Sequence, residues 1–182
     1  MLKKITIGCA ALLALLLIAA GFVLAKAESG ARAFRIERHV HIRATPEEVF
    51  VVLSDLNRHR EWATDEAQRV STIYTVSSPA SGLGASVEWQ DSREGDAGRL
   101  SIVEYRANEF MAARVEVIRP RPAVTRTEWL LAPTPTGTRL SWTVSGPTRF
   151  ALRLLKVFVN PDNVIGDGLE RRLTALKSLV ER

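Results

Sequence analysis

The sequence predicts an α+β domain in which one antiparallel sheet packs against a long C-terminal helix. Between residues 68 and 144, short runs of alternating apolar and polar residues are separated by turn residues. Consecutive strands with short connections form antiparallel sheets. After residue 160, apolar residues recur at steps of three and four, which is typical of an amphipathic helix. This helix must cover the apolar face of the sheet.

The N-terminal segment is long enough to cross a membrane. Residues 5–25 contain no charged side chain, and a helix of this length spans about 32 Å, close to the thickness of a bilayer core. The small residues at 25–27 also fit a signal cleavage site. We therefore expect residues 1–27 to be a transmembrane anchor, or alternatively a cleaved signal segment, and residues 28–33 to be a linker. The domain would then lie on the extracytoplasmic side of the cell membrane, or be secreted after signal cleavage.

The composition excludes some classes of protein. The chain has 46% hydrophobic and 25% charged residues, which is typical of a globular domain and not of a disordered one. Its net charge is +5, but three lysines lie in residues 1–27, so the remainder carries only +2. A remainder with so little charge offers no strong footprint for nucleic acid. The single cysteine, Cys9, allows no internal disulfide.

The first elements of the domain are a strand and two short helices. Residues 34–42 alternate as a half-buried strand does, with Arg38 as the exception on the apolar side. Thr45 to Glu48 reads Thr-Pro-Glu-Glu, which predicts a capping box with proline at the first helical position. Residues 59–62 favour a second short helix.

Six more strands are expected, at residues 70–76, 85–90, 99–107, 111–118, 124–132 and 138–144. Their register can be predicted from the turns. If Thr134 pairs with Gly137, Trp129 lies opposite Trp142 on one apolar face, and the charged residues collect on the other face.

A turn at residues 108–109 sets a second register. It puts Ile102 opposite Val115 and Glu104 opposite Ala113. Glu104 is then a carboxylate on an otherwise apolar face. Three roles are open for it: an ion pair with an arginine such as Arg106, contact with a ligand, or general acid–base catalysis with a pKa raised by an apolar cavity.

The last helix has two unusual glycines. Asn160 and Pro161 predict its start, and Ile165, Leu169 and Leu173 form its apolar stripe. Gly166 and Gly168 lie within it, although glycine destabilises a helix interior, so we expect a close approach or an opening there. The preceding apolar stretch, residues 150–159, is core packed beneath the last helix, a lid, or a helix that dips into the membrane.

The order of motifs resembles the SRPBCC, or START-like, superfamily, in particular its polyketide cyclase/dehydrase-like branch. The matching residues are Ile42-x-Ala44-x-Pro46-x-x-Val49-Phe50, Leu53-x-Asp55-Leu56, Trp62, Gly82-Leu83-Gly84-Ala85-Ser86, Trp89, Gly137-Thr138-Arg139-Leu140-x-Trp142, Ile165-Gly166-Asp167-x-Leu169-Glu170 and Leu173-x-x-Leu176-Lys177.

The resemblance implies a helix-grip fold over residues 34–182: a curved seven-stranded antiparallel sheet around a long C-terminal helix. It also implies a cavity for apolar ligands such as lipids or polyketides. Arg172 departs from the pattern, because many relatives have glycine there, and we expect it to narrow any opening beside the helix.

The predicted function is binding of a small apolar or amphipathic ligand, lipid-like or polyketide-like, by a membrane-anchored domain. The alternatives are an aromatase/cyclase-like enzyme that uses the same cavity, or an interaction module without a ligand. No catalytic residue, cofactor or metal is predicted, since His39 and His41 share a strand face but a zinc site needs three or four ligands. The candidate ligand-binding residues are Val87, Trp89, Leu100, Ile102, Glu104, Ala113, Val115, Trp129, Trp142, Ile165, Leu169 and Leu173.

Overall fold

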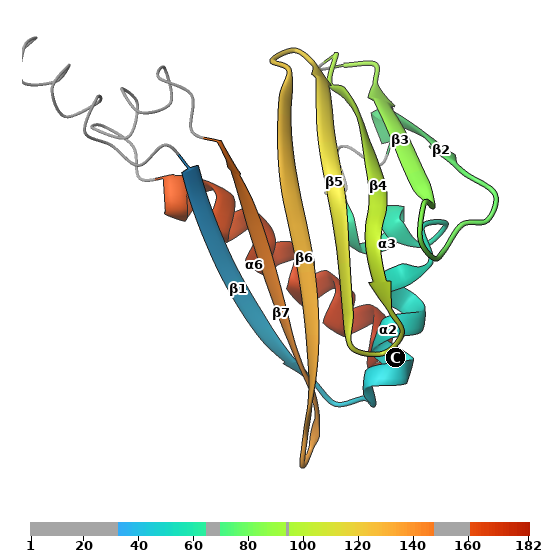
Figure 1. Cartoon of the computed structure of the whole chain (residues 1–182), viewed down its shortest axis with the longest axis vertical. Coiled ribbons are helices and arrows are strands. Elements are labelled where there is room, and N and C mark those ends of the chain that lie inside the picture. The colour runs from blue at the N-terminus through green and yellow to red at the C-terminus, as the bar shows by residue number, and fades with distance from the viewer. Residues whose placement is uncertain (1–32, 65–69, 94, 148–160) are drawn as a thin grey trace, which may run out of the picture. The chain divides into compact units, whose positions relative to one another are not determined.

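The computed structural model describes residues 33–64, 70–93, 95–147 and 161–182. Its main compact unit comprises residues 34–147 and 162–182. The elements (Figure 1) are β1 (Ala33–Ile42), α2 (Pro46–Ser54), α3 (His59–Ala63), β2 (Thr72–Val76), β3 (Ser86–Asp91), β4 (Ala97–Arg106), β5 (Phe110–Arg119), β6 (Ala123–Thr134), β7 (Gly137–Pro147) and α6 (Pro161–Val180). The predicted strands and helices of the domain are thus present, in the predicted order.

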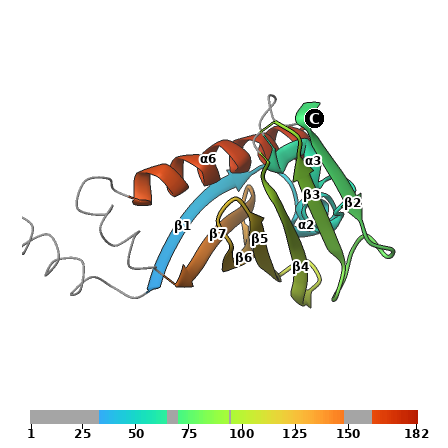
Figure 2. The ribbon, with the colours of Figure 1, turned by 90° about the horizontal axis from the view of Figure 1, so that it is seen from above.

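The strands form one sheet with the order β1-β7-β6-β5-β4-β3-β2. From β2 to β7, each strand pairs antiparallel with the next strand in the chain. Helices α2 and α3 connect β1 to β2, which lie at opposite edges of the sheet. Figure 2 shows the sheet curving, with α2, α3 and α6 on its concave side. This arrangement fits the helix-grip fold.

The core lies between the concave face and the helices. Trp62 of α3 and Trp129 of β6 are each 1% exposed. The ring of Trp62 packs edge-on against those of Trp129 and Trp142, with centroids 6.5 and 5.7 Å apart. These contacts hold α3 against the centre of the sheet, and Leu173 and Leu176 bury the stripe of α6.

The capping box of α2 is confirmed. The Thr45 hydroxyl accepts a hydrogen bond from the Glu48 N–H at 3.3 Å, and the Glu48 carboxylate accepts one from the Thr45 N–H at 2.7 Å. Two amides of the first turn, which has no helical acceptors, thereby gain partners.

The predicted register of β6 and β7 is also confirmed. Thr134 pairs with Gly137, and Trp129 pairs with Trp142. Both indoles lie on the concave face, while Arg126 and Glu128 pair with each other on the outer face. The separation of apolar and charged residues fixed this register, because a slip of one residue would exchange the two faces.

The predicted register of β4 and β5 is wrong. Ile102 pairs with Ala113, and an irregularity after Ile102 makes Glu104 pair with Ala112. A bulge adds one residue to a strand and so reverses the face on which the following residues lie. Val103 is the residue passed over by the ladder, and Glu104 is therefore turned to the outer face.

Several predictions fall outside the described residues. They are the anchor at residues 5–25, most of the linker at 28–33, and the apolar stretch at 150–159. None of the helices in the described ranges is both long and apolar enough to span a membrane.

Candidate functional site

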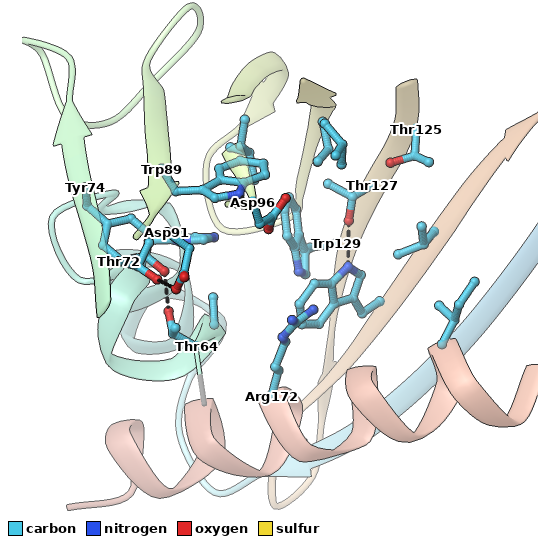
Figure 3. A pocket seen from close by; sticks show the side chains of 18 residues that line it. Thr64, Thr72, Tyr74, Trp89, Asp91, Asp96, Thr125, Thr127, Trp129 and Arg172 are labelled. Carbon is cyan, nitrogen blue, oxygen red and sulfur yellow. Dashed lines mark hydrogen bonds between the residues drawn. The ribbon is translucent and has the colours of Figure 1, made fainter. Parts of the chain in front are cut away.

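A cavity of about 330 Å³ lies between the concave face of the sheet and the helices α3 and α6. Its walls come from β2 to β7 and from both helices (Figure 3). One side is apolar and carries Leu100, Val115 and Val144. The other side, near β2 and β3, carries hydroxyl and carboxylate groups. The cavity thus has an amphipathic lining.

The cavity brings together half of the candidate residues. Those that line it are Trp89, Leu100, Val115, Trp129, Trp142 and Ile165. Another five are placed in the surrounding core without bordering the cavity, namely Val87, Ile102, Ala113, Leu169 and Leu173. Glu104, the remaining one, lies on the outer face.

The position of Glu104 corrects a sequence prediction. Its side chain is exposed, and its Oε1 accepts a hydrogen bond from Nη2 of Arg126 at 2.6 Å. Arg106, the partner suggested from sequence, lies instead over the ring of Phe110, 4.7 Å from its centroid. The bulge between Ile102 and Glu104 is the physical cause, and it removes this carboxylate from the interior.

Arg38 does not line the cavity either. Its guanidinium binds Glu170 at 2.7 Å and Asp162 at 3.2 Å, both on α6. A Cβ at Gly166 would collide with this guanidinium. Gly166 therefore permits the close approach that the sequence predicts. Through its two ion pairs, Arg38 connects β1 to the first turns of α6.

Three indoles form much of the wall. The rings of Trp129 and Trp142 have centroids 5.4 Å apart and planes inclined by 40°. The ring of Trp89 lies over Gly98, where an added Cβ would collide with it. The absence of a side chain at Gly98 lets this indole approach the backbone of β4 closely.

The polar side of the cavity is built from hydrogen-bonded groups. Asp91 is 6% exposed. Its Oδ2 accepts hydrogen bonds from Ser71 at 2.6 Å and from Thr72 at 2.8 Å. Its Oδ1 accepts one from the backbone N–H of Arg93 at 2.7 Å. Both oxygens of this buried carboxylate are therefore engaged by donors of the protein itself.

The other polar groups on this side are also paired. Asp96 accepts a hydrogen bond from the indole N–H of Trp89 at 3.1 Å. The hydroxyls of Thr64 and Tyr74 lie 2.9 Å apart. Figure 3 shows Thr64, Thr72, Tyr74 and Asp91 gathered on one side of the pocket, with Asp96 between Trp89 and Trp129 in this view.

Two buried nitrogens of lining residues have no hydrogen-bond partner within the part of the chain that the structure describes. They are Nε1 of Trp129 and Nδ1 of His59. Burial, and secondly the charge of Arg172, lower the pKa of His59 to about 4 from 6.5. Near neutral pH, His59 is therefore an uncharged imidazole, with one ring nitrogen as a hydrogen-bond donor and the other as an acceptor.

Sequence reasoning missed the polar lining, although signals for it exist. Asp91 follows Val87 and Trp89 at steps of two, so the strand alternation already placed it on the inner face. Arg172 lies three residues after Leu169, on the apolar stripe of α6, and it lines the cavity. His59 lies three residues before Trp62 and shares its helix face.

Across residues 33–64, 70–93, 95–147 and 161–182, no group of three or more His, Cys, Asp or Glu side chains could hold a metal ion. His41 instead lies within hydrogen-bond distance of the hydroxyls of Thr134 and Thr136, at 3.0 and 3.1 Å.

Comparison with known proteins gives a family and a fold. The sequence profile of the family described as "Polyketide cyclase / dehydrase and lipid transport" matches residues 33–181. No curated protein matches. Among solved structures, a Chromobacterium violaceum protein shares 20% identity, with a TM-score of 0.61, over 81% of this chain and 98% of its own.

Two further structures have the same fold. A Rhizobium leguminosarum protein shares 17% identity, with a TM-score of 0.62, over 84% of this chain and 97% of its own. DynU16, from the dynemicin biosynthetic locus, shares 18% identity, with a TM-score of 0.53, over 79% of this chain and 47% of its own. At these identities the likeness concerns the fold alone.

Proposed function

Since this chain belongs to the family of polyketide cyclases/dehydrases and lipid transport proteins, we propose that its cavity binds one small amphipathic molecule. The observation that carries the proposal is the cavity of about 330 Å³, with indoles on its walls and a buried polar side. Ligand sites in proteins are mostly apolar hollows of this size with a few placed polar groups.

The packing around the cavity supports the proposal. Protein cores are normally filled to the density of organic crystals, because an empty space forfeits dispersion contacts. Here the indoles of Trp89, Trp129 and Trp142 border an open volume instead of closing it. A bound molecule would restore the contacts that these rings lack.

Titration with the apolar fluorescent dye N-phenyl-1-naphthylamine tests the proposal. We expect one saturable site per chain, with enhanced dye fluorescence. Val115→Phe, which adds a ring to the cavity wall, should weaken binding at least tenfold. The matched control is Val124→Phe on the outer face, where Val124 is 43% exposed; it should leave binding unchanged. Equal binding by both variants would place the dye elsewhere and refute the proposal.

We also propose that residues 5–25 anchor the domain to the cell membrane, with residues 34–182 on the extracytoplasmic side. The support is the uncharged length of this segment, which matches a bilayer core. After cell fractionation, the full chain should stay in the membrane pellet through an alkaline carbonate wash. A soluble mature chain that begins at Glu28 would show that the segment is instead a cleaved signal.

Catalysis in the same cavity is the second candidate function. The observation that favours it is the uncharged imidazole of His59, a residue of the cavity lining whose Nδ1 has no hydrogen-bond partner among the described residues. An uncharged imidazole can accept a proton from the carbon next to a carbonyl, and its lowered pKa makes it a weaker base than a free histidine. In D₂O, an enzyme should accelerate deuterium exchange at the α-carbon of 2-tetralone, and His59→Phe should abolish the acceleration. A pure binding domain would leave the exchange rate at the solvent value.

A further inference from the structure

The tip of the hairpin that joins β5 to β6, residues 118–124, is exposed, apolar and basic. Residues 119–122 read Arg-Pro-Arg-Pro, and all four are exposed. Ile118 and Val124 flank them and are 57% and 43% exposed. Both lie on the outer face of the sheet, because Val124 pairs with Glu116, two residues before Ile118. The tip thus joins exposed apolar side chains to two arginines.

The charge of these arginines is not neutralised by the sheet. Further along the outer face of β5, Arg114 binds Glu116 at 2.8 Å. Arg119 and Arg121, in contrast, form no ion pair with any residue that the structure describes. The chain also contains no acidic residue from 117 to 127. The tip therefore presents two positive charges to its surroundings.

The turn between β3 and β4 lies beside the tip, because the start of β4 pairs with the end of β5. This turn does not cancel the charge of the tip. Arg93 and Glu94 balance each other in formal charge. Asp91 and Asp96 line the cavity, where hydrogen bonds from the protein hold them. These two carboxylates thus lie on the inner side of the sheet, whereas the arginines of the tip are exposed to solvent.

The tip lies at the end of the sheet where the chain enters the domain. Strand β1 begins at Ala33. A Cβ added to Gly146, near the end of β7, would lie 3.3 Å from the ring of Phe34 and 3.3 Å from the backbone oxygen of Val124. The starts of β1 and β6 therefore flank the end of β7. Figure 1 shows the β5–β6 hairpin at the same end of the sheet as the start of β1.

The length of the linker would keep this end of the sheet near a membrane. Residues 26–32 separate the uncharged segment 5–25 from β1, and the chain from residue 25 to residue 33 reaches at most about 28 Å. Strand β6 lies two strand spacings, about 10 Å, from β1. Residues 148–160, which follow β7, add three basic and no acidic residues at this end. An anchor at 5–25 would thus hold the tip within reach of lipid headgroups.

We propose that the tip docks on an anionic lipid bilayer, with Arg119 and Arg121 on headgroup phosphates and with Ile118 and Val124 against the edge of the acyl region. Basic side chains near an anionic membrane surface strengthen binding, and salt weakens it. This inference rests on the proposed membrane anchor and gives the domain one orientation. Because the cavity lining reaches Val117, next to the tip, docking sets that end of the cavity against the lipid.

Reconstitution of the full chain into vesicles tests the docking. The chain carries Cys9→Ser and Ile118→Cys, and the new cysteine is labelled with the dye NBD, whose emission rises in apolar surroundings. The vesicles are pure phosphatidylcholine, or contain phosphatidylglycerol as about a third of the lipid. Both leaflets have the same composition, so the orientation of the chain does not affect the readout. We expect about twofold higher emission in the anionic vesicles at low salt, and no difference at high salt.

Three variants control for charge and for the position of the dye. Arg119→Gln combined with Arg121→Gln should remove the rise in emission. Arg106→Gln combined with Arg139→Gln removes the same charge from two exposed arginines at the opposite end of the sheet, and should keep the rise. The dye at Ala107→Cys, in the exposed turn between β4 and β5, should give the same emission in both kinds of vesicle.

The outcomes separate docking from anchoring. If the chain resists carbonate extraction from the vesicles but the dye at residue 118 does not respond to anionic lipid, docking is refuted and the anchor stands. A rise that is equal in both kinds of vesicle, or that persists in the Arg119 and Arg121 double variant, also refutes docking. If the vesicles do not retain the chain, the anchor fails, and cosedimentation of the soluble chain decides: binding to anionic vesicles that the double variant loses upholds docking, and no binding refutes it.

Discussion

The indole N–H of Trp142 donates a hydrogen bond to the hydroxyl of Thr127, 2.6 Å away, across the ladder between β6 and β7. Both side chains are buried, at 6% and 3% exposure. The bond holds one indole of the cavity wall in place and satisfies its donor. The adjacent indole of Trp129 has no such partner within the described parts of the chain, so the two indoles of this wall differ in how their donors are satisfied.

Thr127→Val should lower the free energy of unfolding by about 1–3 kcal/mol, because it leaves the buried N–H of Trp142 without an acceptor while keeping the side-chain shape. Urea denaturation followed by circular dichroism measures the change. Thr125→Val, on the same strand and face, is the matched control and should change stability by less than about 0.5 kcal/mol. Equal effects of the two variants would show that the hydrogen bond contributes nothing.

Thr45→Ala should destabilise the domain by about 1 kcal/mol, because the first-turn N–H of Glu48 loses its side-chain acceptor. Thr45→Ser keeps the hydroxyl and should lose only a small part of that stability. The stability of each variant is measured from the denaturant concentration at the unfolding midpoint, with the slope of the transition unchanged. A midpoint for Thr45→Ala that matches the unmodified protein would exclude a contribution from the cap.

Gly168→Ala should raise the free energy of unfolding by up to about 1 kcal/mol, because nothing lies within 4 Å of the added Cβ and alanine favours a helix. Gly166→Ala should gain less or lose stability, because its Cβ would displace the guanidinium of Arg38 from Glu170 and Asp162. Thermal denaturation of both variants compares them. A larger gain at residue 166 would mean that the Arg38 contacts do not hold α6.

The pH dependence of stability should report His59, which is half-buried and whose Nδ1 is enclosed. Its pKa is about 4 in the folded protein and 6.5 ordinarily, so between these values the unfolded chain binds more protons. The free energy of unfolding should therefore fall as the pH drops from 6.5 toward 4, by on the order of 1–3 kcal/mol. Urea midpoints measured across this range give the slope.

His59→Phe should flatten that slope, while His39→Gln, on the exposed face of β1, should not. Carboxylates whose pKa is lowered in the folded protein also make the free energy of unfolding fall as the pH drops, but they do so at lower pH than His59. Hydrogen bonds from Thr45 lower the pKa of Glu48, and a hydrogen bond from Arg126 lowers that of Glu128, both from 4.5. An unchanged slope in His59→Phe would show that this imidazole is not buried uncharged.

Where a pattern spans several residues, the sequence predicts the fold well. The alternation around Trp129 and Trp142 predicts the register of β6 and β7 correctly. The four residues from Thr45 to Glu48 are enough to predict the capping box. A bulge shifts the alternation by one residue, and the few residues between Ile102 and the turn at 108–109 are too short a stretch to reveal that shift. For this reason the face of Glu104 was predicted wrongly.

The candidate site was less predictable, because its residues converge from elements far apart in the chain. The apolar wall followed from the strand patterns. The polar side depends on Asp91, which lies just beyond the predicted strand at residues 85–90, and on Arg172, which the sequence shows only as a departure from a family pattern. The missing partner of Trp129 follows from three-dimensional packing and has no counterpart in the sequence.

Native mass spectrometry of the full chain, purified from its membrane or secreted fraction under mild conditions, tests whether this cavity is a ligand site. We expect one bound small molecule per chain, released on denaturation and absent from Val115→Phe, but retained by Val124→Phe. A chain that carries no bound mass, and takes up none when incubated with a lipid extract, would contradict the claim that this cavity is a ligand site.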